Sequence, residues 1–172
     1  RRRSYPRLMP RNARQMRSGV AGIGTSVTPS DAIASRIAFI TAGVLATNIR
    51  GSTGYGKSYQ KLIHRDWGGA ELKDMEHAAI YLQGLPWVDP DRVGLFGGSF
   101  GGFAALSCAS RLPQPWASAV DICGPVNLIT FAETLPPTWR HRRKRWLGDP
   151  QEDADLLRAR SPLHHAENIH AP

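Results

Sequence analysis

Leu95-Phe96-Gly97-Gly98-Ser99-Phe100-Gly101-Gly102 carries the strongest structural signal in this chain of 172 residues. The stretch contains the pattern G-x-S-x-G, in which a serine occupies a sharp turn between a buried strand and a helix. An apolar run over residues 92–96 favours a buried parallel strand, and small apolar residues over 103–109 favour a helix packed closely on a sheet. The alternative is a glycine-rich turn with an incidental serine. The flanking elements favour the nucleophile elbow.

The glycines and the helix around this serine suit a nucleophile. Side chains at so tight a turn would collide with the neighbouring strand and helix, and we expect Gly97 and Gly101 to relieve that crowding. The positive end of the helix dipole points at Ser99, and the free N–H of Phe100 can donate to the oxyanion of a tetrahedral intermediate. The pattern therefore predicts Ser99 as the nucleophile and the Phe100 amide as an oxyanion donor.

Strands and helices alternate along the rest of the chain. A helix over 69–82 is predicted from an apolar stripe at Leu72, Met75, Ala79 and Leu82. The other predicted elements are a helix over 31–40, buried strands over 43–49 and 117–123, helical segments between 128 and 160 broken at Pro136-Pro137 and Gly148-Asp149-Pro150, and a loop with a short turn over 161–169. This alternation predicts an α/β fold with a mostly parallel sheet and flanking helices.

Composition narrows the class of protein. A hydrophobic fraction of 41% and a charged fraction of 21% are typical of a globular domain. No apolar run approaches the roughly 18 residues of a membrane span, and no secretion signal is expected. Cys108 and Cys123 lie in apolar runs without metal-ligand spacing, so we expect buried thiols in a cytoplasmic protein. The glycine-rich loop over 48–56 lacks the spacing of a phosphate-binding motif.

The positive charge is concentrated at the amino end. Seven arginines occur by residue 17, and no acidic residue precedes Asp31; the other 15 basic residues nearly balance the 14 acidic ones. We interpret residues 1–36 as a basic, irregular arm that is not native family sequence, and residues 37–172 as the domain. A second basic cluster, Arg140–Arg145, lies between Trp139 and Trp146 and is interpreted as a solvated helix face backed by two aromatic anchors.

Three stretches together resemble one family of enzymes. They are Asn48-Ile49-Arg50-Gly51-Ser52-Thr53-Gly54-Tyr55-Gly56, Trp87-Val88-Asp89-Pro90-Asp91-Arg92 and Gly97-Gly98-Ser99-Phe100-Gly101-Gly102. They are similar to the catalytic domain of the prolyl oligopeptidase family of serine peptidases, with the best match to its acylaminoacyl-peptidase-like branch. Pro136-Pro137-Thr138-Trp139, Gly148-Asp149-Pro150 and Ser161-Pro162-Leu163 also fit that branch. The resemblance runs from about Ala42 to Pro172 and implies an α/β-hydrolase fold.

The resemblance also implies an activity and site residues. Ser99 matches the nucleophile, Phe100 matches the residue whose amide forms the oxyanion hole, and Trp139 is expected to line the substrate pocket. The implied reaction is hydrolysis of peptide bonds in short peptides through an acyl-enzyme on Ser99, without a metal or another cofactor. A short peptide is the expected partner, and neither a membrane nor a nucleic acid is. The oligomeric state and the residue preference stay open.

The chain departs from the family pattern on both sides of the elbow. In the family, the acid and the histidine of the triad lie on loops after the next two strands, and this chain stops at Ala171-Pro172, before them. A His-Gly-Gly-Pro segment is also absent upstream. We therefore expect an incomplete fold without its carboxyl-terminal strands, inactive by itself. The six histidines are expected in surface or capping roles: His64, His77, His141, His164, His165 and His170.

Two other functions stay open. An esterase or lipase of the same fold would share the elbow, and the loop over 48–56 and the segment over 136–139 favour the peptidase. A non-catalytic binding module could use the basic arm to contact the phosphates of a nucleic acid.

Overall fold

A computed structural model describes residues 43–172. The chain divides between Asn48 and Ile49, and the elements below all belong to residues 49–172. The predicted strand over 43–49 was wrong, because these residues form no strand. A strand requires a partner for its backbone ladder, and within the described residues the two strands present pair with each other. The predicted helix over 31–40 and the whole of the predicted arm over 1–36 lie outside the described residues.

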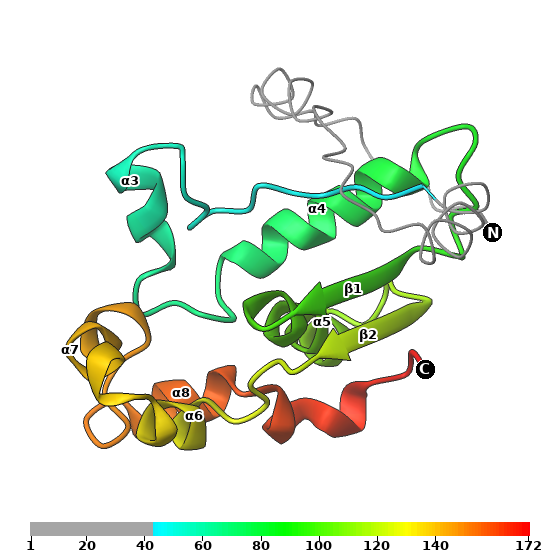
Figure 1. Ribbon diagram of the computed structural model, residues 1–172. Coiled ribbons are helices and arrows are strands. Elements are labelled where there is room, and N and C mark those ends of the chain that lie inside the picture. Colours follow the sequence, from blue (N-terminus) through cyan, green and yellow to red (C-terminus); the bar gives the residue numbers. More distant parts are fainter. Residues whose placement is uncertain (1–42) are drawn as a thin grey trace, which may run out of the picture. The chain divides into compact units, whose positions relative to one another are not determined.

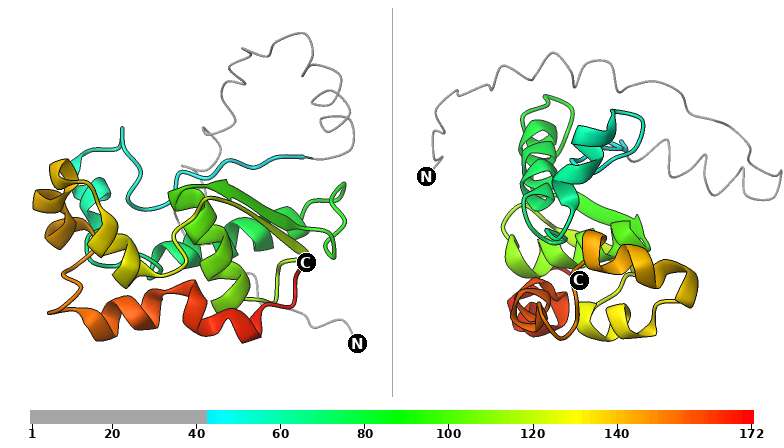
Figure 2. Two further views of the ribbon diagram at one scale, coloured as in Figure 1. Left: turned by 60° about the horizontal axis from the view of Figure 1, so that its bottom comes forward. Right: turned by 90° about the vertical axis from the view of Figure 1, so that its left-hand side faces the viewer.

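The two strands form a parallel pair around the elbow. β1 (Gly94–Gly98) and β2 (Ser118–Ile122) run in register, with Leu95 opposite Ala119 and Phe96 opposite Val120. Helix α5 (Phe100–Arg111) connects them and packs against both. Figures 1 and 2 show α5 along one face of the strand pair. This strand–helix–strand unit confirms the predicted α/β class.

Helix α4 (Glu71–Gln83) completes the first part of the core. Its predicted stripe is confirmed, because Leu72 and Ala79 are buried and Met75 and Leu82 pack against them. The stripe meets Leu95 of β1 and the α5 residues Ala105 and Cys108. Small residues on α5 allow this close approach, as the run over 103–109 predicted. The helix ends at Gly84, whose N–H donates to the Ile80 carbonyl.

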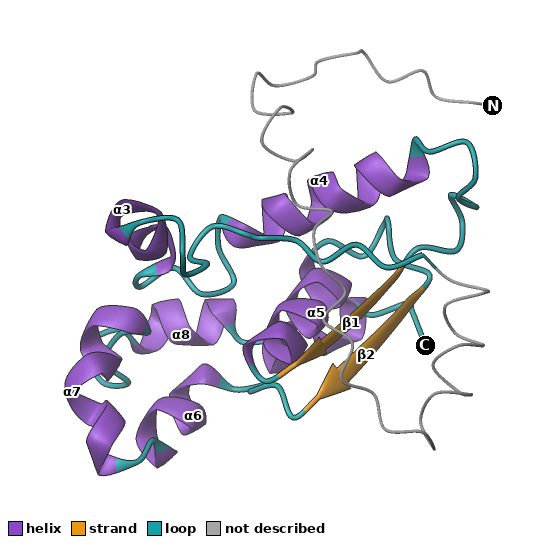
Figure 3. Cartoon of the chain, turned by 45° about the horizontal axis from the view of Figure 1, so that its top comes forward, coloured by secondary structure: helices purple, strands orange, loops and turns teal. Residues whose placement is uncertain are grey.

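Short helices form the rest of the structure. They are α3 (Lys57–Gln60), the 3₁₀ helix η1 (Lys61–Ile63), α6 (Leu128–Thr134), α7 (Pro137–Trp146), α8 (Ala154–Arg160) and the 3₁₀ helix η2 (Pro162–Asn168). The breaks at Pro136-Pro137 and Gly148-Asp149-Pro150 separate α6, α7 and α8 as predicted. The segment over 161–169, predicted as a loop with a short turn, instead contains η2, which packs against α5. Figure 3 shows α6, α7 and α8 beyond the carboxyl ends of the strands.

The second core cluster joins α5 to these helices. Phe103 of α5 is fully buried with Leu128 and Ala132 of α6, Leu147, and Leu157 of α8. Trp67 and Phe100 pack against the same cluster. Phe100, which follows Ser99, therefore packs against a core formed by residues that are far apart in the sequence.

The outer face of the strand pair differs from the prediction of buried strands. Phe96 is 76% exposed, and Val120 and Ile122 are each 49% exposed. These side chains alternate with Leu95 and Ala119, which face α5, so they lie on the opposite face, which no described element covers. Cys123 is likewise exposed rather than buried, whereas Cys108 is buried as predicted. Within residues 43–172, no helix has the length and apolarity that a membrane crossing requires.

Candidate active site

Ser99 occupies the turn between β1 and α5. Its backbone adopts φ 54° and ψ −118°, a conformation that L-residues rarely take, and the residue is exposed. The Ser99 N–H donates to the Ile122 carbonyl on β2 at 2.8 Å, and the Ser99 carbonyl accepts from the Phe103 N–H at 3.0 Å. The strained residue is thus held by hydrogen bonds to β2 and to α5, at an exposed position.

Gly97 makes this turn possible. A Cβ at Gly97 would overlap the backbone carbonyl of Gly101, so the crowding that the sequence predicted at Gly97 is present. The expectation for Gly101 itself was wrong, because a Cβ there would meet nothing within 4 Å. The next glycine is the crowded one: a Cβ at Gly102 would overlap the Asp121 carboxylate, which accepts from the Gly124 N–H at 2.8 Å. Gly97 of β1 thus lies close to Gly101, and Asp121 of β2 lies close to Gly102.

The Phe100 amide is the first of α5. Within residues 43–172 it has no hydrogen-bond acceptor. The first amides of a helix have no intrahelical acceptor and lie at the positive end of its dipole. This amide is therefore available to an oxyanion formed beside Ser99.

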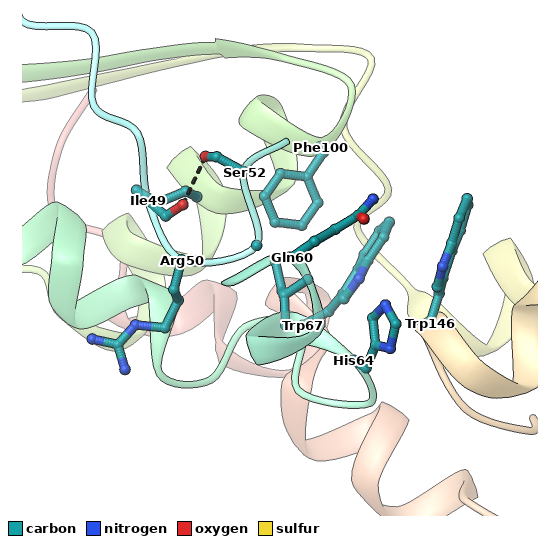
Figure 4. A pocket seen from close by; sticks show the side chains of 10 residues that line it. Ile49, Arg50, Ser52, Gln60, His64, Trp67, Phe100 and Trp146 are labelled. Atoms are coloured by element: carbon teal, nitrogen blue, oxygen red, sulfur yellow. Dashed lines mark hydrogen bonds between the residues drawn. The ribbon is translucent and has the colours of Figure 1, made fainter. Parts of the chain in front are cut away.

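A cavity of about 250 Å³ adjoins Phe100. Phe100, Trp67 and Trp146 are its aromatic lining residues, and residues 49–52 also line it. Gln60 and His64 line it from the α3–η1 segment, and Figure 4 shows His64 beside Trp146 at one end. The lining is mainly apolar, which suits a large hydrophobic side chain.

Trp67 supports Phe100. The two rings meet edge to face with centroids 4.8 Å apart, and Trp67 also contacts Phe103 at 5.9 Å and Phe131 at 6.1 Å. Edge-to-face geometry is favourable for aromatic pairs and restricts the orientation of both rings. Sequence reasoning missed Trp67. The available signal was an aromatic residue beside Gly68-Gly69, at the entrance to α4.

A group of polar residues, here called the Gly68 network, holds the loop that carries Trp67. Glu71 accepts from the Gly68 N–H at 2.5 Å and the Gly69 N–H at 3.0 Å. Arg160 donates to the Gly68 carbonyl at 2.7 Å and to the Asp66 carboxylate at 2.8 Å, and Arg111 donates to the same carbonyl. The network therefore joins the loop to α4, α5 and α8.

Burial perturbs the ionisable groups of this network. Glu71 is 1% exposed, and burial raises the pKa of its carboxyl group while the backbone N–H donors oppose the shift. Burial and then the nearby Arg160 lower the pKa of Arg111. Gly68 has φ +71°, and a Cβ there would lie 3.1 Å from Phe103, so the turn is restricted to glycine. The network therefore holds the backbone next to Trp67 by hydrogen bonds from three helices.

Trp139 does not line the cavity beside Phe100. It is 52% exposed and lines a smaller cavity together with Trp67 and Trp146. Its ring meets Trp146 edge to face, with centroids 6.4 Å apart. The substrate-binding role expected for Trp139 stays a prediction. The solvated character of the basic cluster is confirmed, since no residue of α7 is buried.

The histidines take several positions. His77, His141, His164 and His170 are exposed. His165 is half-buried, and its Nε2 lies 2.9 Å from the Ala159 carbonyl. His64 is half-buried in the cavity wall, a position that the expectation of a surface or capping role did not anticipate. Among the described residues, none of these rings is hydrogen-bonded to Ser99 Oγ.

The sequence profile of the Prolyl oligopeptidase family matches residues 36–172. The chain belongs to this family. Over 134 residues it is 37% identical to dipeptidyl aminopeptidase BIII of Pseudoxanthomonas mexicana, a match that covers 75% of this chain and 19% of that protein.

Solved structures of this family share the fold. A puromycin-hydrolyzing peptidase of Mycobacterium tuberculosis superposes with a TM-score of 0.67 at 30% identity, covering 73% of this chain and 19% of that one. The acylaminoacyl peptidase of Pyrococcus horikoshii superposes with a TM-score of 0.65 at 23% identity, covering 73% and 20%. The predicted α/β-hydrolase fold is thus confirmed. The chain spans about a fifth of the length of these relatives.

Proposed function

We propose that this chain supplies the nucleophile of a serine peptidase. Ser99 Oγ attacks the carbonyl carbon of a peptide bond, and the Phe100 N–H stabilises the oxyanion that forms. The C–N bond then breaks, the amine leaves with a proton, and water hydrolyses the acyl-enzyme. The observation that carries the proposal is the strained Ser99 at the start of α5, with an unpaired Phe100 amide beside an apolar cavity. Two of the relatives, an aminopeptidase and a puromycin-hydrolyzing peptidase, support peptide-like substrates.

The same geometry leads us to propose a slow reaction for the 172-residue chain. Ser99 Oγ has no hydrogen-bonded base among the described residues, and a serine hydroxyl without a base is a poor nucleophile at neutral pH. Loss of triad members lowers turnover by about 10⁴–10⁶ in serine peptidases. The Phe100 amide and the cavity would still favour attack at this one serine.

Labelling with a fluorophosphonate probe tests both parts. We expect slow, stoichiometric labelling of Ser99, abolished by Ser99→Ala and unchanged by Ser58→Ala, which alters an exposed serine of α3. Absence of labelling at Ser99 would contradict its role as nucleophile. Labelling at the rate of an intact triad would contradict the lack of a base.

The competing function is that of an esterase. A form of the protein that carries a complete triad should hydrolyse peptide p-nitroanilides as well as p-nitrophenyl esters. Turnover of the esters alone would favour the esterase.

A further inference from the structure

The two strands of the parallel pair end in the same unusual way. Gly98 and Ile122 lie opposite each other in the register, and the residues that follow them, Ser99 and Cys123, have φ of 54° and 52°. L-residues rarely adopt positive φ, so each of these turns requires contacts that hold it. The Ile122 carbonyl holds Ser99 by accepting from its N–H at 2.8 Å. The turn at the end of β2 therefore supplies an acceptor that stabilises the candidate nucleophile.

Asp121 closes this turn at the end of β2. Its Oδ1 atom accepts from the Gly124 N–H at 2.8 Å, and the hydrogen bond spans Ile122 and Cys123. Side-chain bonds of this kind restrict the backbone of the residues that they enclose. The carbonyl that accepts from Ser99 and the left-handed Cys123 both lie inside the closed turn. The orientation of the Ile122 carbonyl therefore depends on Asp121.

The closed turn also lies against the start of α5. A Cβ at Gly124 would overlap the backbone of Gly102 and Phe103, and a Cβ at Gly102 would overlap the Asp121 carboxylate. The Phe103 N–H donates to the Ser99 carbonyl at 3.0 Å. The turn that Asp121 closes thus provides one hydrogen bond of the Ser99 backbone and packs against the donor of the other.

We propose that Asp121 is a positioning residue for Ser99. By closing the turn, it holds the Ile122 carbonyl and the start of α5 in the places that keep Ser99 in its strained conformation, next to the Phe100 N–H. This proposal rests on the proposed function of Ser99. It adds to that function a residue that acts on the nucleophile through the backbone of β2, without contacting the substrate.

Loss of the Asp121 hydrogen bond should lower the rate of the chemical step and leave affinity unchanged. A displacement of about 1 Å in a reacting group lowers a rate by about 100-fold. The β1–β2 ladder and α5 remain in a variant of Asp121, so we expect a smaller displacement and a loss of about tenfold. Residues 121–124 do not line the cavity beside Phe100, so binding of an apolar group there should persist.

Saturation kinetics with a fluorophosphonate probe separate rate from affinity. Labelling of the full chain at a series of probe concentrations gives a maximal rate and a half-saturating concentration. We expect Asp121→Ala to lower the maximal rate about tenfold and to change the half-saturating concentration by less than about twofold. Asp121→Asn keeps a side-chain oxygen that accepts from the Gly124 N–H, and it should retain the maximal rate within about threefold. Near-UV circular dichroism verifies that each variant is folded.

Asp89→Ala is the matched control. Asp89 also accepts from a backbone N–H in a turn, that of Asp91 at 3.1 Å, but this turn precedes β1 whereas Ser99 follows it. We expect Asp89→Ala to leave the maximal rate unchanged. Equal losses in Asp89→Ala and Asp121→Ala would overturn the proposal. An unchanged maximal rate in Asp121→Ala, or an equal loss in Asp121→Asn, would also overturn it.

Asp121→Ser tests the same hydrogen bond if Asp121→Ala does not fold. The serine oxygen is one bond closer to the backbone than the aspartate oxygens, so it lies farther from the Gly124 N–H. We expect the maximal rate to fall by about threefold or more. A maximal rate equal to that of the unmodified chain would overturn the proposal.

The outcome is separable from the proposed function. Labelling of Ser99 in the unmodified chain, with no loss of rate in Asp121→Ala, would reject the positioning role and retain the nucleophile. Absence of labelling in the unmodified chain would reject the nucleophile and the positioning role with it.

Discussion

Two groups of charged residues in this molecule behave in opposite ways. On one side, the Gly68 network places Asp66, Glu71, Arg111 and Arg160 in contacts that satisfy nearly every donor and acceptor around one glycine. On the other side, Lys61 and Arg145 are exposed and have no carboxylate partner within the described residues. The first arrangement holds the loop, and the second is free to exchange water for a ligand.

Desolvation accounts for the difference. A charge removed from water is tolerated only when hydrogen bonds replace its hydration, so buried charges must have fixed partners. An exposed cation keeps its water and contributes little to stability, but it attracts anions that approach. We expect variants of the Gly68 network to change stability, and variants of Lys61 and Arg145 to leave it nearly unchanged.

The largest difference between buried and exposed positions should be in thiol reactivity. Burial, and then the negative charge of Glu71, raise the pKa of the Cys108 thiol to about 12, whereas Cys123 is exposed. At pH 8 the thiolate fraction of Cys108 is then about 10⁻⁴, and the thiolate is the reactive form. Ellman's reagent should release one equivalent rapidly from the native chain and the second only after unfolding. Cys123→Ser should remove the fast equivalent, and rapid reaction of both thiols would contradict the burial of Cys108.

Arg160→Ala tests the Gly68 network directly. Arg160 joins α8 to Asp66 and Gly68, and the Arg160 and Asp66 side chains are 26% and 33% exposed. Breaking a fully buried pair costs about 3–5 kcal/mol, and with this partial exposure we expect a loss of about 2–3 kcal/mol in the free energy of unfolding. Urea denaturation measures it. Arg158→Ala, an exposed residue of the same helix, should change the value by less than about 0.5 kcal/mol. Equal losses of unfolding free energy in Arg160→Ala and Arg158→Ala would contradict a specific role for Arg160 in the Gly68 network.

Glu71→Gln should have a smaller effect. The side-chain amide of the new glutamine has one oxygen acceptor in place of two. Its NH₂ group would therefore face the N–H of Gly68 or Gly69 and leave a buried donor unsatisfied, at a cost of about 1–2 kcal/mol. Burial raises the pKa of Glu71, so the native state binds its proton more tightly than the unfolded state. The wild-type free energy of unfolding should therefore fall as pH rises above about 4.5, the ordinary value for glutamate. Between pH 4 and 7, the free energy of unfolding measured by denaturation should therefore fall less in Glu71→Gln than in the wild type, because the variant lacks this carboxyl group. Glu133→Gln, at an exposed glutamate of α6, is the matched control.

The smallest effect on stability is expected at Lys61 and Arg145. Lys61→Ala and Arg145→Ala should each change the free energy of unfolding by less than about 0.5 kcal/mol, because neither cation has a fixed partner in the described part of the chain. Thermal denaturation at matched salt measures this. A loss of unfolding free energy comparable to that of Arg160→Ala would mean that these two cations also stabilise the fold.

The sequence predicted those features that depend on neighbouring residues. The apolar run before Ser99, the small residues after it and Gly97 are all local requirements of one sharp turn, and they identified β1, the elbow and α5. The α4 stripe likewise predicted its buried face, because a period of 3.6 residues determines which side chains share a side. The strand predicted over 43–49 failed, because apolar character does not supply a ladder partner.

The partners of the charged residues were decided by the tertiary structure alone. Asp66 and Arg160 lie 94 residues apart, and His64 and Arg145 lie on separate elements, so no local pattern links them. The sequence by itself determined a serine on a strained turn at the start of a helix, because that geometry depends on consecutive residues. Packing of α5, α7 and α8 around Trp67 determined which charges are buried with partners and which remain exposed beside the cavity, because burial depends on the whole fold.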